Sequence, residues 1–247
     1  MLHSSLNYKR VVKFLIEPEE FVHVGHAKGL ELGGADLPII KVDGKPIIPG
    51  SSIKGCVRNE FTRVLTALPQ AKLMSMFGYP KLLTDNVQEI LKKYDSKEIA
   101  NKIKEGMKDP NNATIGLLDL LFGSEVFASP TIFTDALPVE EKEEYTTIRY
   151  HVRIDIDKDV AMRGNLVEIE ATNPDVKFEF RVIYNSLDYG VKDSPVDKAF
   201  DYLIKFLDGK EILIGGWKSR GYGLVKLIKK EDITLKVEDL LGVSNER

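Results

Sequence analysis

The chain has 247 residues and a formal net charge of −3, which is long enough for one large domain or two small ones with a sizeable core. With 43% hydrophobic and 30% charged residues, it is neither intrinsically disordered nor a strongly basic nucleic-acid-binding protein. No apolar run approaches a membrane span, no signal peptide opens the chain, and a single cysteine, Cys56, excludes an internal disulfide framework. We therefore expect a soluble cytoplasmic protein without a membrane partner, in which any nucleic-acid site is a local patch.

The start of the chain predicts a strand, a loop and a hairpin. Alternation in "YKRVVKFLI" places Val12, Phe14 and Ile16 on one face of a strand. A glycine-rich loop then covers residues 25–36. The stretch "IIKVDGKPIIP" predicts two short strands about a turn at Asp43-Gly44.

Helices are expected next. The first runs from Ser52 to Leu68, capped by Ser51 or Ser52 and ended by Pro69. Its apolar face has helical spacing: Ile53, Val57, Phe61, Val64 and Leu68. A mostly helical block follows at about 79–121, with one apolar stripe formed by Ile99, Ile103 and Met107. Because this block interrupts the strand pattern, we interpret it as an insertion.

The second half predicts strands around one further helix. Strands are expected in "PTIFTDA", in "TIRYHVRIDI" and on both sides of a turn at 173–175. Ser194, Pro195 and Asp197 start a helix with a capping box, and Gly209 ends it. The stretch "EILIGGWKSRGYGLVKLI" predicts a strand, a glycine-rich loop and a strand. The order predicts an α+β fold with an antiparallel sheet and helices on one face, most simply a ferredoxin-like or RNA-recognition-motif core with insertions.

The stretch "PGSSIKGCVR" at 49–58 is a candidate anion site. A glycine-serine turn opens a helix there, and free backbone amides at a helix start favour a phosphate. Lys54 and Arg58 lie one turn apart beside the apolar face. The glycine and lysine spacing excludes a Walker loop. The alternative is a capped helix with two solvated basic side chains.

The stretch "GGWKSRGYG" at 215–223 is a second candidate. Its four glycines permit unusual backbone angles. Lys218 and Arg220 are suited to phosphate contacts, and Trp217 and Tyr222 to stacking on bases. The alternative is a tight loop whose aromatic side chains pack inward.

The glycine-rich loop before the first helix is a third candidate, because His23, His26, Lys28 and Asp36 lie near its glycines. Two histidines three residues apart make no zinc site without further ligands, so no zinc is predicted. Asp36 is suited to bind a divalent cation through oxygen, or to position a ribose 2′-hydroxyl for attack on its own phosphate. The alternative is an ordinary turn residue.

The segment 136–172 is a fourth candidate. Arg149, Arg153 and Arg163 are spread along its strands, after an acidic stretch "PVEEKEEY". This pattern is compatible with a protruding β-arm or with the outer face of an ordinary strand.

Taken together, these pieces resemble the RAMP superfamily of CRISPR-associated proteins. The resemblance rests on "ADLPIIKVDGKPIIPGSSIKGCVR", "LFGSEVFASPTIFTDA", "RIDIDKDVAMRGNLVEIEATNP" and "GGWKSRGYGLVKL", in this order over nearly the whole chain. It is closest to the backbone subunit of type III, Csm-type, interference complexes.

The resemblance implies a single domain over 1–247 with a helical lid at 79–121 and a thumb-like β-hairpin at 136–172. It implies copies stacked with other type III subunits along CRISPR RNA, and cleavage of the complementary target RNA with a divalent cation, Mg²⁺ or Mn²⁺, bound together with the substrate. The family's catalytic aspartate precedes an "Asp-Ser-Pro-Val-Ile"-like stretch, so this role falls on Asp36, although Leu37 replaces the serine. RNA binding carries over to eight residues: His23, His26, Ser51, Ser52, Lys54, Arg58, Lys218 and Arg220.

Three functions follow from these patterns. The first is an RNA-guided endoribonuclease subunit that uses Asp36. The second is a catalytically inactive backbone subunit in which Asp36 is a turn residue. The third is a metal-independent nuclease that processes guide RNA with His23 or His26 as the base.

Overall fold

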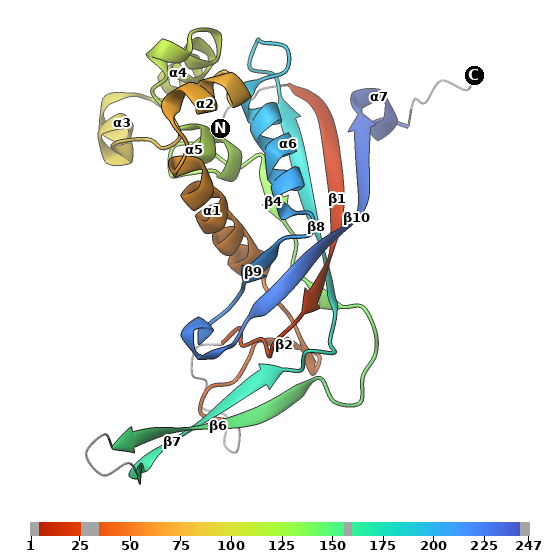
Figure 1. Cartoon of the computed structure of the whole chain (residues 1–247). Helices are drawn as coiled ribbons and strands as arrows, with labels where there is room; N and C mark the ends of the chain where they lie inside the picture. Colours follow the sequence, from red (N-terminus) through yellow and green to blue (C-terminus); the bar gives the residue numbers. More distant parts are fainter. Residues whose placement is uncertain (1–4, 26–34, 156–159, 243–247) are drawn as a thin grey trace.

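A computed structural model describes residues 5–25, 35–155 and 160–242, and its centre is one antiparallel sheet (Figure 1). The strand order is β4-β8-β1-β10-β9, and β5 also pairs with β8. The bounds are β1 Leu6–Pro18, β4 Thr131–Phe133, β5 Leu137–Pro138, β8 Phe178–Leu187, β9 Glu211–Leu213 and β10 Leu224–Lys236. The two central contacts, β1 with β8 and β1 with β10, pair residues far apart in the sequence.

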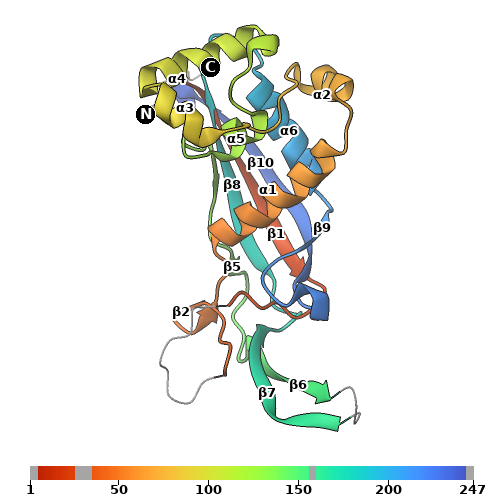
Figure 2. The same ribbon diagram turned by 90° about the vertical axis from the view of Figure 1, so that its left-hand side faces the viewer.

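Helices cover one face of this sheet. Figure 2 shows α1 (Gly50–Thr66), α5 (Leu117–Phe122) and α6 (Pro195–Leu207) in front of the strands. Val12, Phe14 and Ile16 lie on the covered face and are fully buried, which confirms the alternation predicted for β1. Ser194 and Asp197 form the predicted capping box of α6, with Pro195 at its first position. The α+β class and the one-sided helical layer are therefore confirmed.

A group of helices stands beyond one end of the sheet. It comprises α2 (Gln70–Phe77), α3 (Val87–Lys93) and α4 (Ser96–Lys108). A short 3-10 turn at Pro110–Asn112 then leads back to α5 on the covered face. The helical block expected at 79–121 is confirmed, and its apolar stripe at Ile99, Ile103 and Met107 is buried. The sequence patterns did not predict α2, which begins directly after Pro69, the N-cap residue.

Two small ribbons lie at the opposite end of the sheet. The β-ribbon consists of β6 (Thr146–Asp155) and β7 (Val160–Thr172), an antiparallel pair outside the main sheet (Figure 1). The second ribbon pairs β2 (Lys41–Val42) with β3 (Lys45–Pro46) about the predicted turn. The β-ribbon is shorter than the expected arm at 136–172, because Leu137–Pro138 pairs with β8 and Ala136 bridges Ile48.

Helix α1 differs from its prediction in start, cap and face. It begins at Gly50, after Pro49, and no serine side chain caps it. Val64 is 43% exposed, whereas Leu65 is 2% exposed. The buried stripe therefore has a spacing of four residues rather than the predicted mixture of spacings: Ile53, Val57, Phe61 and Leu65.

The chain ends with β10 and the short helix α7 (Val237–Leu240). None of the helices within the described ranges is long and apolar enough to cross a membrane.

The glycines at 221 and 223 form a matched pair for a stability test. Both have positive φ, +79° at Gly221 and +86° at Gly223. A Cβ on Gly223 would lie 2.1 Å from the Ile214 carbonyl oxygen, whereas one on Gly221 meets nothing within 4 Å. We expect Gly221→Ala to lower the free energy of unfolding by about 1–2 kcal/mol, and Gly223→Ala by at least about 2 kcal/mol more. Urea unfolding measures both, and equal losses would contradict a steric role for Gly223.

Candidate functional site

A small apolar cluster holds the root of the β-ribbon against the main sheet. Its buried members are Ile169 and Ala171 of β7 and Tyr222 from the loop between β9 and β10. Four partly buried side chains pack against them: Phe21, Leu37, Val167 and Trp217. The cluster thereby joins β7 to three separate segments, namely the end of β1, the Asp36 segment and the glycine-rich loop at 215–223.

Asp36 lies at this junction with an exposed side chain. Its Oδ2 accepts a hydrogen bond of 3.1 Å from the backbone N–H of Glu168. Leu37 forms a parallel bridge with Ile169, so the Asp36 segment pairs with β7. The Asp36 carboxylate is therefore exposed, while the segment that carries it is held on β7.

Glu170 anchors the same segment from its other side. Its carboxylate accepts hydrogen bonds from the Ile39 N–H at 3.2 Å and the Thr146 hydroxyl at 3.0 Å, and it forms an ion pair with Lys41. Burial raises the pKa of Glu170, but the hydrogen bonds from Lys41, Ile39 and Thr146 outweigh it and hold this pKa below its usual range.

His23 is buried at this junction, with an exposed fraction of 5%. Its Nδ1 lies 2.7 Å from the Glu170 carbonyl oxygen, and its own carbonyl accepts a hydrogen bond from the Gly216 N–H. A Cβ on Gly215 would lie 2.2 Å from that carbonyl oxygen, so only glycine fits there. His23 thus connects β7 to the glycine-rich loop and presents little surface to a ligand. His26 and Lys28 lie outside the described residues.

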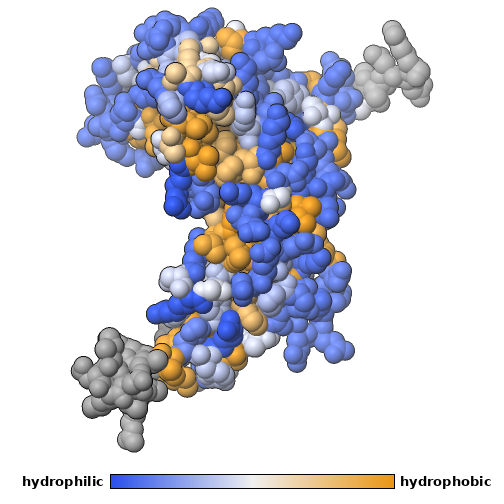
Figure 3. All heavy atoms as spheres, viewed as in Figure 1, coloured by the Kyte–Doolittle hydropathy of each residue, from blue (hydrophilic) through white to orange (hydrophobic). Residues whose placement is uncertain are grey.

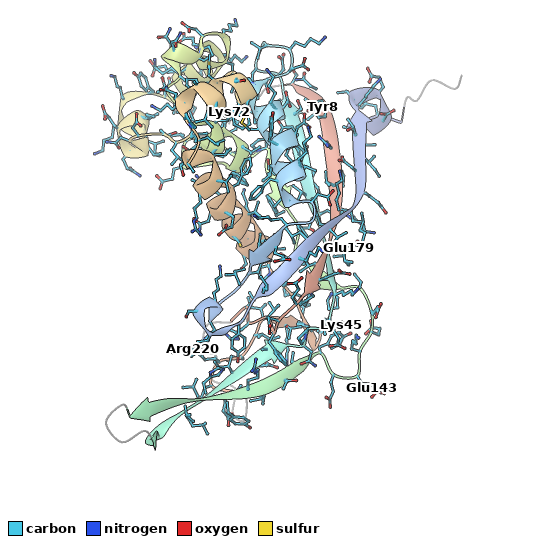
Figure 4. All side chains as sticks on the ribbon, viewed as in Figure 1. Tyr8, Lys45, Lys72, Glu143, Glu179 and Arg220 are labelled. Carbon is cyan, nitrogen blue, oxygen red and sulfur yellow. The ribbon has the colours of Figure 1, made fainter. Side chains whose placement is uncertain are left out.

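The loop at 215–223 turns Lys218 and Arg220 outward. Both residues are exposed, and Figure 4 shows Arg220 at the end of the sheet that faces the β-ribbon. The Arg220 guanidinium lies 4.1 Å from the centroid of the Trp217 ring. Tyr222, by contrast, is fully buried, so the prediction that it stacks on bases is wrong: its ring packs inward instead.

Arg149 and His151 of β6 complete the junction. The sequence placed Arg149 in the candidate segment 136–172 without a contact, and it assigned His151 to no site. Arg149 lies over the rings of Phe21 at 4.5 Å and Tyr222 at 5.2 Å. His151 Nε2 lies 2.6 Å from the Tyr222 hydroxyl, and its ring lies 5.6 Å from that of Trp217. The strict alternation of polar and apolar residues in "TIRYHVR" was the sequence signal that Arg149 and His151 share one face of the strand.

The apolar face of the β-ribbon points away from the protein. Four side chains on it are 44–62% exposed: Ile148, Tyr150, Val152 and Leu166. Figure 3 shows hydrophobic atoms on this ribbon. The ribbon therefore inverts the usual amphipathic pattern, because its cationic residue Arg149 packs inward.

The start of α1 already holds a protein carboxylate. Asp135 Oδ1 accepts a hydrogen bond of 2.8 Å from the Gly50 N–H, and the Ser52 N–H bonds to the Pro49 carbonyl. The helix start is thus less open to a phosphate than its sequence indicates. Ser51 is exposed and Ser52 is half-buried.

Lys54 and Arg58 differ in their surroundings. Lys54 is half-buried with its Nζ 3.4 Å from the Thr131 carbonyl, and burial, with a contribution from Arg58, lowers its pKa. Arg58 donates hydrogen bonds to Asp119 at 2.7 Å and to the Gly123 carbonyl at 2.9 Å. Asp119 is 5% exposed, so the Arg58 guanidinium compensates a buried charge.

Within the described ranges, no group of three or more His, Cys, Asp or Glu side chains is arranged to hold a metal ion.

The family model of the RAMP superfamily matches residues 16–226. The chain belongs to the RAMP superfamily. Two curated relatives share the name CRISPR system Cms endoribonuclease Csm3. The RAMP chain is 27% identical to the one from Methanocaldococcus jannaschii over 92% of its own length and 81% of the relative. It is 26% identical to the one from Streptococcus thermophilus, over 89% of its own length and 87% of the relative.

Two solved structures share the fold of this chain. One is the type III-B Cmr-beta structure bound to cognate target RNA, with a TM-score of 0.51 and 19% identity, where the alignment covers 93% of this chain and 61% of that chain. The other is the apo state of type III-B Cmr-beta, with a TM-score of 0.50 and 14% identity over 90% of this chain and 97% of that chain.

We expect Arg58→Ala to lower the free energy of unfolding by about 2–3 kcal/mol, because it leaves the buried Asp119 carboxylate unpaired; the value allows for the partial exposure of Arg58. The matched control is Arg63→Ala, whose pair with Glu60 is exposed and should change stability by less than about 0.5 kcal/mol. Urea unfolding compares the two, and similar small losses would show that Asp119 does not depend on Arg58.

The single tryptophan, Trp217, provides a probe of His151. Burial, Arg149 and Arg220 all lower the pKa of His151, so the neutral imidazole is favoured in the folded state. The contribution of neutral His151 to the free energy of unfolding is complete above a pH of about 6.5, the pKa of histidine in the unfolded chain. This contribution is lost as the pH falls through the lower pKa of His151 in the folded protein. We expect Trp217 fluorescence to titrate with a midpoint below about 6.5, and His151→Gln to abolish the titration. A midpoint above that value would contradict the description of His151.

Proposed function

We propose that this RAMP protein is a CRISPR RNA-binding backbone subunit of a type III effector complex, and that it cleaves guide-paired target RNA with Asp36. The observation that carries the proposal is the exposed Asp36 carboxylate, held on β7 at the small apolar cluster against which Trp217, from the loop of Lys218 and Arg220, also packs. Support comes from the two relatives named as endoribonucleases and from the fold shared with a Cmr-beta chain solved with target RNA.

The proposed core is ferredoxin-like, of the RNA-recognition-motif type. The elements β1, α1, β4, β8, α6 and β10 follow one another as β-α-β-β-α-β, and their sheet order supports this assignment. We assign the helical segment 79–121, which contains α3, α4 and most of α5, to a lid. We assign the β-ribbon to the thumb, with a tip that lies outside the described residues.

RNA binding in this proposal uses the end of the sheet rather than its open face. RNA-recognition motifs bind bases on aromatic side chains of the open sheet face. The aromatic residues of these strands lie instead on the helix-covered side: Tyr8, Phe14, Phe133, Phe178, Phe180 and Tyr184. The open face carries ion pairs such as Lys13 with Glu179. Phosphate contacts by cationic loops are independent of sequence, as binding of any guide requires.

The chemistry proposed for Asp36 is cleavage of the target backbone by internal transesterification. The ribose 2′-hydroxyl loses its proton and attacks the adjacent phosphorus, and the bond to the 5′-oxygen breaks. The products are a 2′,3′-cyclic phosphate and a 5′-hydroxyl, whose leaving oxygen takes up a proton. The exposed Asp36 carboxylate would orient the attacking ribose 2′-hydroxyl and share a divalent cation, Mg²⁺ or Mn²⁺, with the scissile phosphate. The bound cation would neutralise charge that develops on the phosphate. The Glu168 N–H fixes one carboxylate oxygen and leaves the other for this contact.

Further copies of the chain and other type III subunits are the proposed protein partners. The exposed apolar face of the β-ribbon supports such assembly, because contiguous exposed apolar side chains commonly mark interaction sites.

A catalytically inactive backbone subunit is the second candidate function, favoured by the hydrogen bond that gives the Asp36 carboxylate a structural partner in the Glu168 N–H. The burial of His23 and its bond to Glu170 argue against that histidine as the general base of a guide-processing nuclease.

Asp36→Asn should lower the rate of target-RNA cleavage in the assembled complex by at least about 100-fold, because it removes the carboxylate that orients the attacking group. Asp43→Asn is the matched control, since Asp43 is an exposed aspartate at positive φ, a conformation that asparagine tolerates. The assay is repeated with EDTA, and guide binding is measured in parallel. Full cleavage by Asp36→Asn would eliminate the proposed catalytic role and favour the second candidate.

Lys218→Ala combined with Arg220→Ala should weaken guide-RNA binding. It should also reduce the slope of log K against log salt by about 0.7 for each phosphate that the variant no longer neutralises. Lys72→Ala is the control, because Lys72 is exposed on α2 at the far end of the molecule (Figure 4). A salt slope that stays unchanged in the double variant would place the guide on another surface.

A further inference from the structure

We propose that Glu170 is a positioning residue for cleavage: its carboxylate fixes the register of the Asp36 segment on the β-ribbon and so sets where the Asp36 carboxylate points. This inference rests on the proposed function of Asp36 as the catalytic acid, and it assigns a role to a residue that neither motif nor resemblance singled out.

Backbone pairing between the Asp36 segment and β7 is short. Leu37 donates its N–H to the Glu168 carbonyl at 3.0 Å and accepts the Glu170 N–H at 3.0 Å. The third bond is the one from the Glu168 N–H to the Asp36 carboxylate itself. A shift by one residue would turn the Asp36 side chain to the opposite side. The position of Asp36 therefore depends on whatever holds this register.

The Glu170 side chain provides further contacts that fix this register. It accepts the Ile39 N–H, three residues after Asp36, and pairs with Lys41 two residues further on. The Thr146 hydroxyl binds the same carboxylate from β6. With 13% of its side chain exposed, Glu170 is largely withdrawn from water, where charged hydrogen bonds are stronger than at the surface.

These contacts connect both strands of the β-ribbon to the Asp36 segment. Thr146 belongs to β6 and Glu170 belongs to β7, whereas Ile39 and Lys41 follow Asp36 in the chain. A displacement of the ribbon root would thus move Asp36 with it, rather than leave the acid on an independent loop.

The experiment compares Glu170→Ala with Glu143→Ala in the assembled complex. Glu143 is exposed, lies outside the β-ribbon, and its side chain makes no hydrogen bond to a residue in the described ranges, so the control removes the same charge without the anchor. Single-turnover cleavage and target-RNA affinity are measured at a temperature at which both variants remain folded by circular dichroism. Amide exchange of Ile39 is followed in the isolated chain.

We expect Glu170→Ala to slow the cleavage step by at least about 10-fold, as displaced catalytic groups do, while target affinity stays unchanged. Ile39 should exchange faster in this variant only. Glu170→Gln keeps one acceptor oxygen for the Ile39 N–H and places an NH2 group, which can donate to the Thr146 hydroxyl, where the second oxygen was. It loses the charge toward Lys41, so it should recover part of the rate. A general loss of stability would lower affinity and cleavage together and would not be rescued in this way.

The outcomes separate the two proposals. If Asp36→Asn is inactive and Glu170→Ala cleaves as fast as Glu143→Ala, the positioning role is overturned and the catalytic acid stands. If Glu170→Ala loses target affinity in proportion to cleavage, or if Ile39 exchange does not change, the positioning role is also overturned. Full cleavage by Asp36→Asn overturns the proposed function and this inference with it.

Discussion

The packing of Ile169, Ala171 and Tyr222 is the interaction on which the rest of the candidate site depends. This small cluster is separate from the main core under the helices, and it holds segments that lie more than a hundred residues apart in the chain. Because Leu37 and Trp217 both pack against it, Asp36 and the cationic loop at 215–223 share one support. Loss of the cluster would separate the acid from the loop even if the main sheet remained intact.

The charges at this junction are arranged so that some are used internally and others are left for a ligand. Arg149 and Glu170 face inward, onto aromatic rings and onto backbone or hydroxyl donors. Lys218 and Arg220 face outward on a loop shaped by glycines with positive φ. The net charge of −3 is compatible with an RNA site of this kind, because the local distribution of charge matters more than its sum.

The first turns of α1 illustrate why a basic residue in a motif is not by itself a ligand contact. Arg58 neutralises the buried Asp119, so its removal would change folding as well as any binding. Asp135 takes the amide of Gly50 that the motif suggested for a phosphate. Lys54 keeps its amine half-buried beside a carbonyl group, with no carboxylate partner among the described residues. The assignment of these residues to RNA therefore remains a prediction, and the loop at 215–223 has the more open geometry.

Local patterns in the sequence determined the elements and the class of the fold. Alternation placed Val12, Phe14 and Ile16 in the core, and the capping box placed the start of α6, because these signals depend only on neighbouring residues. The motif order also led to the RAMP superfamily and to Asp36.

Only the tertiary structure decided which side chains meet. The burial of Tyr222, the inward turn of Arg149 and the three partners of Glu170 arise from strands paired across long sequence separations. No periodicity encodes such contacts, since the same alternation in β6 fits either face inward. The sequence by itself thus named an acid and its loop, and the packing of the β-ribbon root determined what holds that acid in place.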